Sequence, residues 1–318
     1  MLNLLLNVPG DIKAKIAEFS QNDEILVGKI ELVILFGDEL IKVKSQVEAI
    51  GGIFENLGFG YGIITIGIED IPKISTIQEI QYIELPKTLF TSDLGSNRAS
   101  CVPEVWSLYN LTGEGVLVGF IDSGIDYLHP AFKNEEGGTR IEYIYDLSQG
   151  GKVWNKNDIN RAINSTDPYS VVSQRDIIGH GTHVAGIACA GGNINKTYYG
   201  VAYKSSIAMV KMTGSGKVSY AKSTQLMRGI KFLIQKSKEL KQPLVISLSF
   251  STNDGAHNGN SLLEQYIQTI CNLERISFVI ASGNEGAAAH HAGGVLRENV
   301  NLSMAMAADE KSLILQFY

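Results

Sequence analysis

Four uninterrupted apolar runs in the second half of the chain constrain its fold more than any other feature. They span residues 116–121, 207–212, 244–248 and 276–281. A strand that is apolar at consecutive positions is buried on both faces, as in parallel sheets covered by helices. Segments with helical spacing alternate with these runs, over residues 183–190, 224–240 and 262–272. The pattern predicts an α/β domain with a doubly wound parallel sheet.

The first 90 residues show a different order of elements. The spacing of apolar and turn residues predicts strands over 31–36, 53–57, 61–68 and 80–85, and helices over 39–50 and 70–79. The order β-α-β-β-α-β is that of a ferredoxin-like α+β sandwich. A leading helix is expected near residues 8–20. We therefore expect a first domain over 1–90, a polar and glycine-rich linker over 91–113, and the α/β domain over 114–300.

Composition excludes several classes of protein. The 27 Lys+Arg and 33 Asp+Glu residues give a net charge of −6, which argues against a nucleic-acid partner. No run approaches the roughly 18 apolar residues of a membrane span, so no membrane partner is expected. Three cysteines cannot build a disulfide framework. The first residues lack a cationic start, so no cleavable secretory signal is expected.

Two polar motifs follow predicted strands or open predicted helices, where open α/β sheets place their sites. Asp122 ends the first apolar run and is followed by Ser123-Gly124. Taken alone, Asp122 is more simply interpreted as a residue that caps the turn after a strand. His180 opens the segment His-Gly-Thr-His-Val-Ala-Gly and can accept a proton if a carboxylate holds its other ring nitrogen. A zinc pair with His183 is the competing interpretation, but no cysteine ligand or H-E-x-x-H arrangement is near, so His183 is expected to be structural.

A third motif, Ser282-Gly283-Asn284-Glu285-Gly286, follows the last apolar run. An amide presented from such a loop can donate a hydrogen bond to a developing oxyanion. The alternative is an ordinary glycine turn with Asn284 in a left-handed conformation.

In this chain order, the three motifs resemble those of the subtilisin-like serine proteases, the subtilase family. The resemblance covers residues from about 111 to 294. Residues 31–90 are also similar to the family's ferredoxin-like propeptide, which acts as a folding chaperone and inhibitor. More narrowly, the chain resembles the clostridial Csp germination proteases through residues 97–101, 126–130, 138–141 and 290–291. That resemblance implies a place in the spore or in the cytoplasm of the mother cell.

The resemblance also implies roles for individual residues. Asp122 would orient His180, His180 would act as general base, and Asn284 would be the side-chain oxyanion donor. An extended peptide or protein substrate would lie between two strands, formed by Ser249, Phe250 and Ser251 on one side and by Gly214, Ser215 and Gly216 on the other. The chain's own propeptide would be an intramolecular inhibitor. Ser251 stands where the family usually has glycine and is expected to narrow the substrate pocket.

The sequence departs from the family at the nucleophile. No Gly-Thr-Ser segment occurs among the 318 residues. Ser303-Met304-Ala305 imitates the centre of that motif, but neither its flanking residues nor its spacing fits. The resemblance to the Csp proteases implies that residues 301–318 begin an inserted jelly-roll domain, and we expect the chain to stop before its serine. Without the nucleophile, this chain is expected to be inactive on its own.

Metal binding is not expected from the sequence. The family's calcium-binding aspartate after His-Pro is Ala131 here, which leaves Asn193 and main-chain carbonyls as a weak ligand set. His290-His291 is interpreted as a surface loop, with a weak metal pair as the alternative. We therefore expect no metal and no cofactor.

Three functions remain in view. The first is a subtilase zymogen that activates a spore-germination hydrolase by proteolysis. The second is a catalytically inactive pseudoprotease with a regulatory or binding role. The third is a protease inhibitor formed by residues 1–90 alone. The intact Asp122, His180 and Asn284 favour the first.

Overall fold

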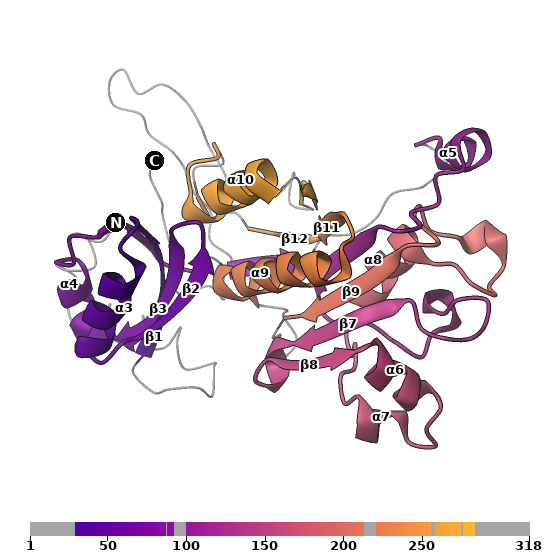
Figure 1. Ribbon diagram of the computed structural model, residues 1–318, viewed down its shortest axis with the longest axis horizontal. Helices are drawn as coiled ribbons and strands as arrows, with labels where there is room; N and C mark the ends of the chain where they lie inside the picture. The colour runs from indigo at the N-terminus through magenta and orange to yellow at the C-terminus, as the bar shows by residue number, and fades with distance from the viewer. Residues whose placement is uncertain are drawn as a thin grey trace, which may run out of the picture.

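The computed structural model describes residues 29–86, 88–91, 100–212, 221–252, 254–255, 258–274 and 276–283. In Figure 1, a small sheet with helices α3 and α4 lies on the left and a larger sheet lies on the right, with α9 between them. The predicted leading helix near residues 8–20 and the predicted domain start at 301–318 lie outside the described residues.

The N-terminal domain is a four-stranded antiparallel sheet in the order β2-β3-β1-β4. Its elements are β1 (Lys29–Phe36), α3 (Leu40–Ala49), β2 (Ile53–Gly58), β3 (Tyr61–Gly67), η1 (Ile68–Asp70), α4 (Ile71–Ile74) and β4 (Ile80–Glu84). This is the predicted ferredoxin-like arrangement. The predicted helix over 70–79 is shorter, because the Ser75 and Thr76 hydroxyls donate to main-chain carbonyls three residues back, where they compete with helical hydrogen bonding.

The N-terminal sheet is buried on both faces, which explains its continuous apolar strands. Leu32 and Ile34 of β1 pack with Ile64 and the residues of α3 on one face. Val33, between them, points to the other face and packs against α9 and α10 of the second domain. Successive strand residues alternate between faces, so one apolar run supplies two cores.

Charged and aromatic residues connect the two domains. Arg228 of α9 donates to Glu31 and to Glu55, each at 2.7 Å. Tyr61 meets Tyr266 of α10 edge to face, with ring centroids 5.1 Å apart. These contacts bind the outer face of the N-terminal sheet to the two helices.

The second domain contains a six-stranded sheet in the order β13-β11-β6-β9-β7-β8, parallel except for the β7–β8 pair. The strands are β6 (Leu117–Asp122), β7 (Ile141–Asp146), β8 (Lys152–Asn155), β9 (Ser206–Lys211), β11 (Leu244–Leu248) and β13 (Ser277–Ile280). The helices are α6 (Lys156–Ile163), α7 (Pro168–Val171), α8 (His180–Cys189), α9 (Ser223–Leu240) and α10 (Leu262–Glu274), with 3-10 turns η2 (Pro130–Phe132), η3 (Leu147–Gln149) and η4 (Lys196–Tyr198). The predicted doubly wound α/β class is confirmed; β7 and β8 were not anticipated.

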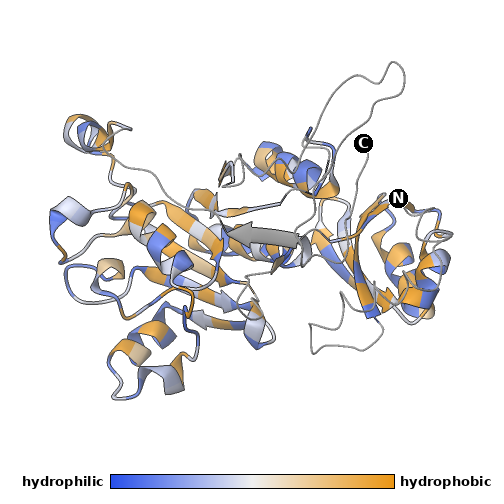
Figure 2. Ribbon diagram, turned by 180° about the vertical axis from the view of Figure 1, so that it is seen from behind, coloured by the Kyte–Doolittle hydropathy of each residue, from blue (hydrophilic) through white to orange (hydrophobic). Residues whose placement is uncertain are grey.

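Helices cover both faces of this sheet. Leu117 and Ile121 of β6 belong to the core under α9 and α10, whereas Val118 and Phe120 belong to the core on the side of α8. Figure 2 shows many hydrophobic residues on the strands of the central sheet and a mixture of hydrophobic and hydrophilic residues along the helices. None of the helices in the described ranges is long and apolar enough to cross a bilayer.

One helix lies inside the predicted linker, and one strand ends at its first residue. Helix α5 (Val102–Tyr109) projects from the second domain in Figure 1. Strand β5 (Thr88–Thr91) pairs antiparallel with β10 (Ala221–Lys222) on one side and β12 (Phe250–Ser251) on the other. The segment that follows the N-terminal domain therefore enters the second domain as the middle strand of a small sheet.

Candidate active site

Asp122 is the last residue of β6, in the interior of the sheet at its carboxyl edge. All six residues of this strand are buried, and the Asp122 main-chain oxygen accepts a hydrogen bond from Met212, just after β9, at 2.8 Å. The carboxylate accepts a hydrogen bond from the main-chain N–H of Ser123 at 2.7 Å. A buried strand end thus fixes one orientation for this side chain.

His180 is the first residue of α8 and faces Asp122. Its Nδ1 lies 2.8 Å from Asp122 Oδ1, and the two side chains are 13% and 2% exposed. An ionised carboxylate only accepts hydrogen bonds, so Nδ1 carries the proton of the neutral ring and the basic lone pair is on Nε2. The structure therefore brings together the two residues that the sequence analysis selected as carboxylate and base.

Gly181 allows this close approach of helix and strand. A side chain at that position would overlap the Gly124 carbonyl oxygen and lie 3.0 Å from Asp122 Oδ1. The glycine in the His-Gly-Thr-His segment is therefore required by the contact between α8 and the end of β6.

A small sheet in the order β10-β5-β12 lies beside the pair, and the place between β10 and β12, which β5 fills, is called the groove. In β12, Phe250 pairs with Thr91 and Ser251 pairs with Phe90 of β5. The rings of Phe250 and His180 have centroids 6.4 Å apart. An extended segment is thus hydrogen-bonded main chain to main chain next to the Asp122–His180 pair. Two of the three residues predicted to pair with a peptide, Phe250 and Ser251, do so with β5.

The opposite side of the groove is described only in part. Gly214, Ser215 and Gly216 lie outside the described residues, so their role stays a prediction. The strand that pairs with β5 on that side is Ala221–Lys222, directly before α9. The sequence analysis missed it because a two-residue strand leaves no periodic signal.

Ser251 lies next to the loop that leads to Asn284. A Cβ placed on Gly283, whose φ is +90°, would lie 3.4 Å from the Ser251 hydroxyl. The Ser251 side chain therefore lies close to the Gly283 main chain, and its effect on a substrate pocket stays a prediction. Asn284, His290, His291 and Ser303 lie outside the described residues, and their predicted roles stay predictions.

Asp176 also belongs to this site, although the sequence analysis did not select it. Its carboxylate accepts hydrogen bonds from Ser123 and from residues at the start of α8. The available signal was an acidic residue in the turn before a predicted helix, four positions before His180.

Two positions that entered the discussion of metal binding, Ala131 in place of the family's aspartate and His183, can be located in the structure. The Ala131 carbonyl accepts a hydrogen bond from the buried Arg140 guanidinium at 2.7 Å, and burial lowers the pKa of Arg140. His183 is exposed on α8. Within the part of the chain that the structure describes, no three His, Cys, Asp or Glu side chains are grouped to hold a metal ion.

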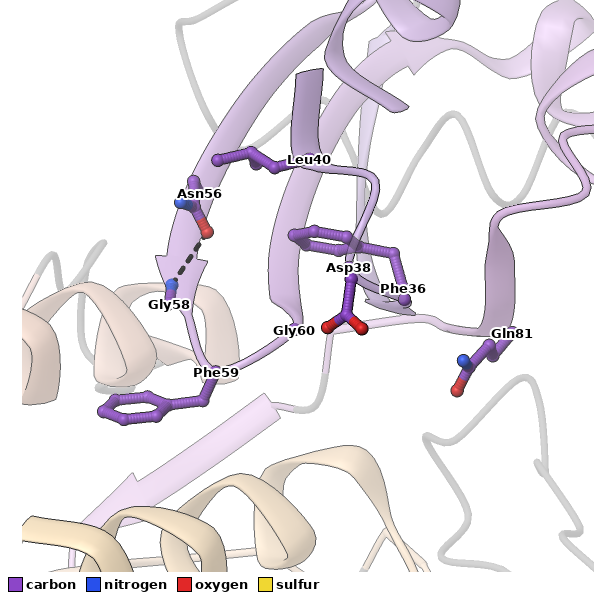
Figure 3. A pocket seen from close by; sticks show the side chains of 9 residues that line it. Phe36, Asp38, Leu40, Asn56, Gly58, Phe59, Gly60 and Gln81 are labelled. Carbon is purple, nitrogen blue, oxygen red and sulfur yellow. Dashed lines mark hydrogen bonds between the residues drawn. The ribbon is translucent and has the colours of Figure 1, made fainter. Parts of the chain in front are cut away.

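A separate hollow opens on the N-terminal domain (Figure 3). It lies between the end of β1 and the β2–β3 hairpin, with Phe36, Asp38, Phe59 and Gln81 on its walls. All of its lining residues come from the N-terminal domain, so it is distinct from the site of Asp122 and His180.

Comparison with protein families assigns both parts of the chain. The Csp protease B prodomain matches residues 1–87, and the subtilase family matches residues 113–312. The PI-type proteinase of Lactococcus lactis subsp. cremoris is 27% identical over 281 residues, which are 82% of this chain and 14% of the relative. Neuroendocrine convertase 2 of Homo sapiens is 36% identical over 113 residues, 35% of this chain and 15% of the relative.

Two solved structures are similar over most of the chain. The Clostridium perfringens CspB protease is 66% identical with a TM-score of 0.61, over 63% of this chain and 43% of that one. Fervidolysin from Fervidobacterium pennivorans shares the fold at 18% identity and a TM-score of 0.52, over 83% of this chain and 41% of that one. The chain spans less than half the length of each of these relatives.

The match to the subtilase family extends over most of the chain and includes the segments that carry Asp122 and His180. The chain therefore belongs to the subtilase family of serine peptidases and carries a prodomain of the Csp protease B type.

Proposed function

We propose that a protein carrying these residues together with a Gly-Thr-Ser nucleophile segment is a serine-type endopeptidase. The observation that carries the proposal is the buried Asp122–His180 pair, at 2.8 Å, beside a groove that binds an extended segment. Antiparallel pairing forms hydrogen bonds only with the main chain of the bound segment, so such a groove can bind peptides of different sequence. Specificity would then come from pockets that bind the side chains.

In this mechanism, Asp122 keeps the His180 proton on Nδ1 and stabilises the imidazolium that forms. His180 Nε2 takes the proton from the attacking hydroxyl and later gives it to the leaving amine. Asn284, which follows the described loop over 281–283, would donate a hydrogen bond to the oxyanion of the tetrahedral intermediate. Losing one such donor costs on the order of 10²–10³ in kcat.

The 318 residues by themselves hold the base and the groove but no Gly-Thr-Ser segment. We propose that they bind peptide without cleaving it. In this chain, β5 fills the groove between β10 and β12, so the segment after the prodomain acts as an internal competitor of substrate.

For the whole protein, we propose a substrate among the precursors of spore-germination hydrolases, in the spore or the mother-cell cytoplasm. The support is the Csp protease B prodomain and the 66% identity to the C. perfringens CspB protease.

The test uses the product of the whole gene and its His180→Ala variant. We expect a fluorophosphonate to label the first protein and not the second, because the reagent reacts with a serine activated by a base. The first should also cleave a germination-hydrolase precursor. The 318-residue chain should stay unlabelled, and its labelling would contradict the assignment of no nucleophile.

A pseudoprotease is the second candidate, favoured by the absence of Gly-Thr-Ser from these residues. It predicts that the whole-gene product binds peptide in the groove and is neither labelled nor able to cleave. That outcome would replace the proposed activity.

A further inference from the structure

The helix that carries His180 begins without a capping side chain of its own. The residue before it, Gly179, has φ +83° and no side chain. The first main-chain N–H groups of a helix have no partner inside it and need acceptors from elsewhere. In this structure they find them on Asp176 and Ser123.

The Asp176 carboxylate receives four hydrogen bonds at this helix end. Its Oδ1 accepts from Gly179 N–H at 2.9 Å and from the Ser123 hydroxyl at 2.8 Å. Its Oδ2 accepts from the Thr182 N–H at 2.8 Å and from the Thr182 hydroxyl at 2.6 Å. Two of the donor residues therefore flank His180 along the chain: Gly179 directly before it and Thr182 two positions after it.

Ser123 connects this carboxylate to Asp122. The Ser123 hydroxyl donates to Asp176 and accepts from Gly181 N–H at 2.9 Å. The main-chain N–H of the same residue donates to Asp122 Oδ1, the oxygen that also contacts His180. A continuous set of hydrogen bonds thus runs from Asp176 through Ser123 to the carboxylate of the pair.

A second connection ties the helix to the loop after β6. The Thr182 hydroxyl donates to Asp176 and accepts from the main-chain N–H of Asp126 at 2.8 Å. Each hydroxyl in the network uses its single proton toward Asp176 and a lone pair toward a main-chain N–H. All four hydrogen bonds to Asp176 use its two carboxylate oxygens as acceptors.

We propose that Asp176 is a positioning residue for the peptidase reaction, which holds the start of α8 so that His180 meets Asp122. The effect on peptidase activity rests on the proposed function, whereas the hydrogen bonds that hold the start of α8 do not depend on it. A base must be held within about 0.5 Å of its productive place to work well. Asp176 supplies that constraint from the side of the helix, as the buried end of β6 supplies it for Asp122.

Asp176→Asn is the informative substitution, because it keeps the size of the side chain. Gly179 N–H binds one carboxylate oxygen and Thr182 N–H the other, and neither donor can rotate away. Whichever oxygen becomes an NH₂ group then faces a main-chain donor. Asp146→Asn is the matched control: Asp146 is buried at the end of β7 in the same sheet and accepts from Ser148 and Gln149.

The measurement is the proton NMR signal of His180 Nδ1–H in the 318-residue chain labelled with ¹⁵N-histidine. Six histidines are present, and His180→Ala assigns the signal. We expect Asp176→Asn to shift the signal upfield and to speed its exchange with water at least tenfold. Asp146→Asn should lower the unfolding midpoint and leave the signal in place. In a whole-gene product that is active, Asp176→Asn should lower kcat at least tenfold and change KM less than twofold.

An unchanged His180 signal in folded Asp176→Asn protein would overturn the proposal, as would an equal shift in Asp146→Asn. If Asp176→Asn does not fold, Ser123→Ala tests the same set of hydrogen bonds. It should shift the signal in the same direction, and no shift would overturn the proposal. The NMR signal needs no nucleophile, so a whole-gene product without peptidase activity would contradict the proposed function and leave this test intact.

Discussion

The two ends of α8 are held by charges of opposite sign from other parts of the chain. At the N-terminal end lie the carboxylates of Asp122 and Asp176. At the C-terminal end, the Arg140 guanidinium donates to the carbonyl oxygen of Cys189, the last residue of α8, and to that of Ser205 at 3.0 Å. Negative charge at the start of a helix and positive charge at its end both complement the helix dipole.

The two ends of α8 differ in how accessible they are to a substrate. Arg140 is 9% exposed and Cys189 is fully buried, so the C-terminal end is closed to substrate. The N-terminal end opens beside the groove that holds β5, where the Phe250 and His180 rings lie close together. The same electrostatic arrangement therefore lies next to the proposed substrate groove at one end of the helix and inside the core at the other. The predictions below test this division, from the largest expected effect to the smallest.

Asp122→Asn should act on catalysis and hardly on stability. An amide at this position leaves His180 free to place its proton on the wrong nitrogen, which costs about 10⁴-fold in kcat. The measurement is kcat of the whole-gene product together with its urea unfolding curve. If Asp122→Asn mainly lowered the midpoint of urea unfolding, the assignment of catalysis to the start of α8 and of stability to its end would be contradicted.

Arg140→Ala should act on stability. It removes a buried cation that donates to the carbonyls of Ala131, Cys189 and Ser205, and leaves these oxygens without that donor. The expected cost is about 3–5 kcal/mol of unfolding free energy, measured by urea denaturation.

Arg161→Ala is the control for this substitution. Arg161 is an exposed arginine paired with Asp158 on α6 and should cost less than about 0.5 kcal/mol. Equal losses of unfolding free energy in the two arginine variants would show that the buried contacts of Arg140 do not contribute to stability.

Two glycines of the α8 region should respond with opposite signs to alanine. Gly179 has φ +83°, a conformation that costs an L-residue about 1–2 kcal/mol, so Gly179→Ala should destabilise the protein. Gly186 lies inside the helix, and a Cβ there meets no atom within 4 Å. Gly186→Ala should stabilise by roughly 0.5–1 kcal/mol through helix propensity. Thermal unfolding of both variants checks the pair. Destabilisation by Gly186→Ala would contradict the open space at that position of α8, and no destabilisation by Gly179→Ala would contradict the assigned helix start.

The C-terminal end of α8 should also show a weak dependence on alkaline pH. Burial raises the pKa of Cys189 to about 11, above the ordinary value of 9.0. Above pH 9 the unfolded chain loses this proton first, so the folded state becomes less stable as pH rises. We expect a loss of about 1 kcal/mol between pH 9 and 10 from this thiol.

Cys189→Ala isolates that contribution, because the other thiol and the phenols with a raised pKa stay in place: Cys271, Tyr127, Tyr145 and Tyr266. The slope of unfolding free energy against pH should be shallower in the variant. An equal slope in the two proteins would contradict the assignment to Cys189.

Apolar spacing predicted much of the fold before any coordinates. The continuous runs became β6, β9, β11 and β13, and the N-terminal order of strands and helices was correct. These elements were predictable because a strand buried on both faces, or a helix with one apolar face, leaves a periodic signal. The strands β5 and β10 were not, because they have two to four residues and depend on main-chain pairing between distant segments, and β12 was expected only through the family resemblance.

Within the site, residue type and local motif were sufficient for Asp122 and His180, since a carboxylate at a buried strand end and a histidine at a helix start both stand out in the sequence. Asp176 did not stand out, because its partners Ser123 and Thr182 identify it only once the helix lies against the strand. The sequence by itself determined which elements form and which reactive groups they carry. Only the tertiary structure decided which groups meet, because a hydrogen bond depends on atoms a few ångströms apart that lie far apart along the chain.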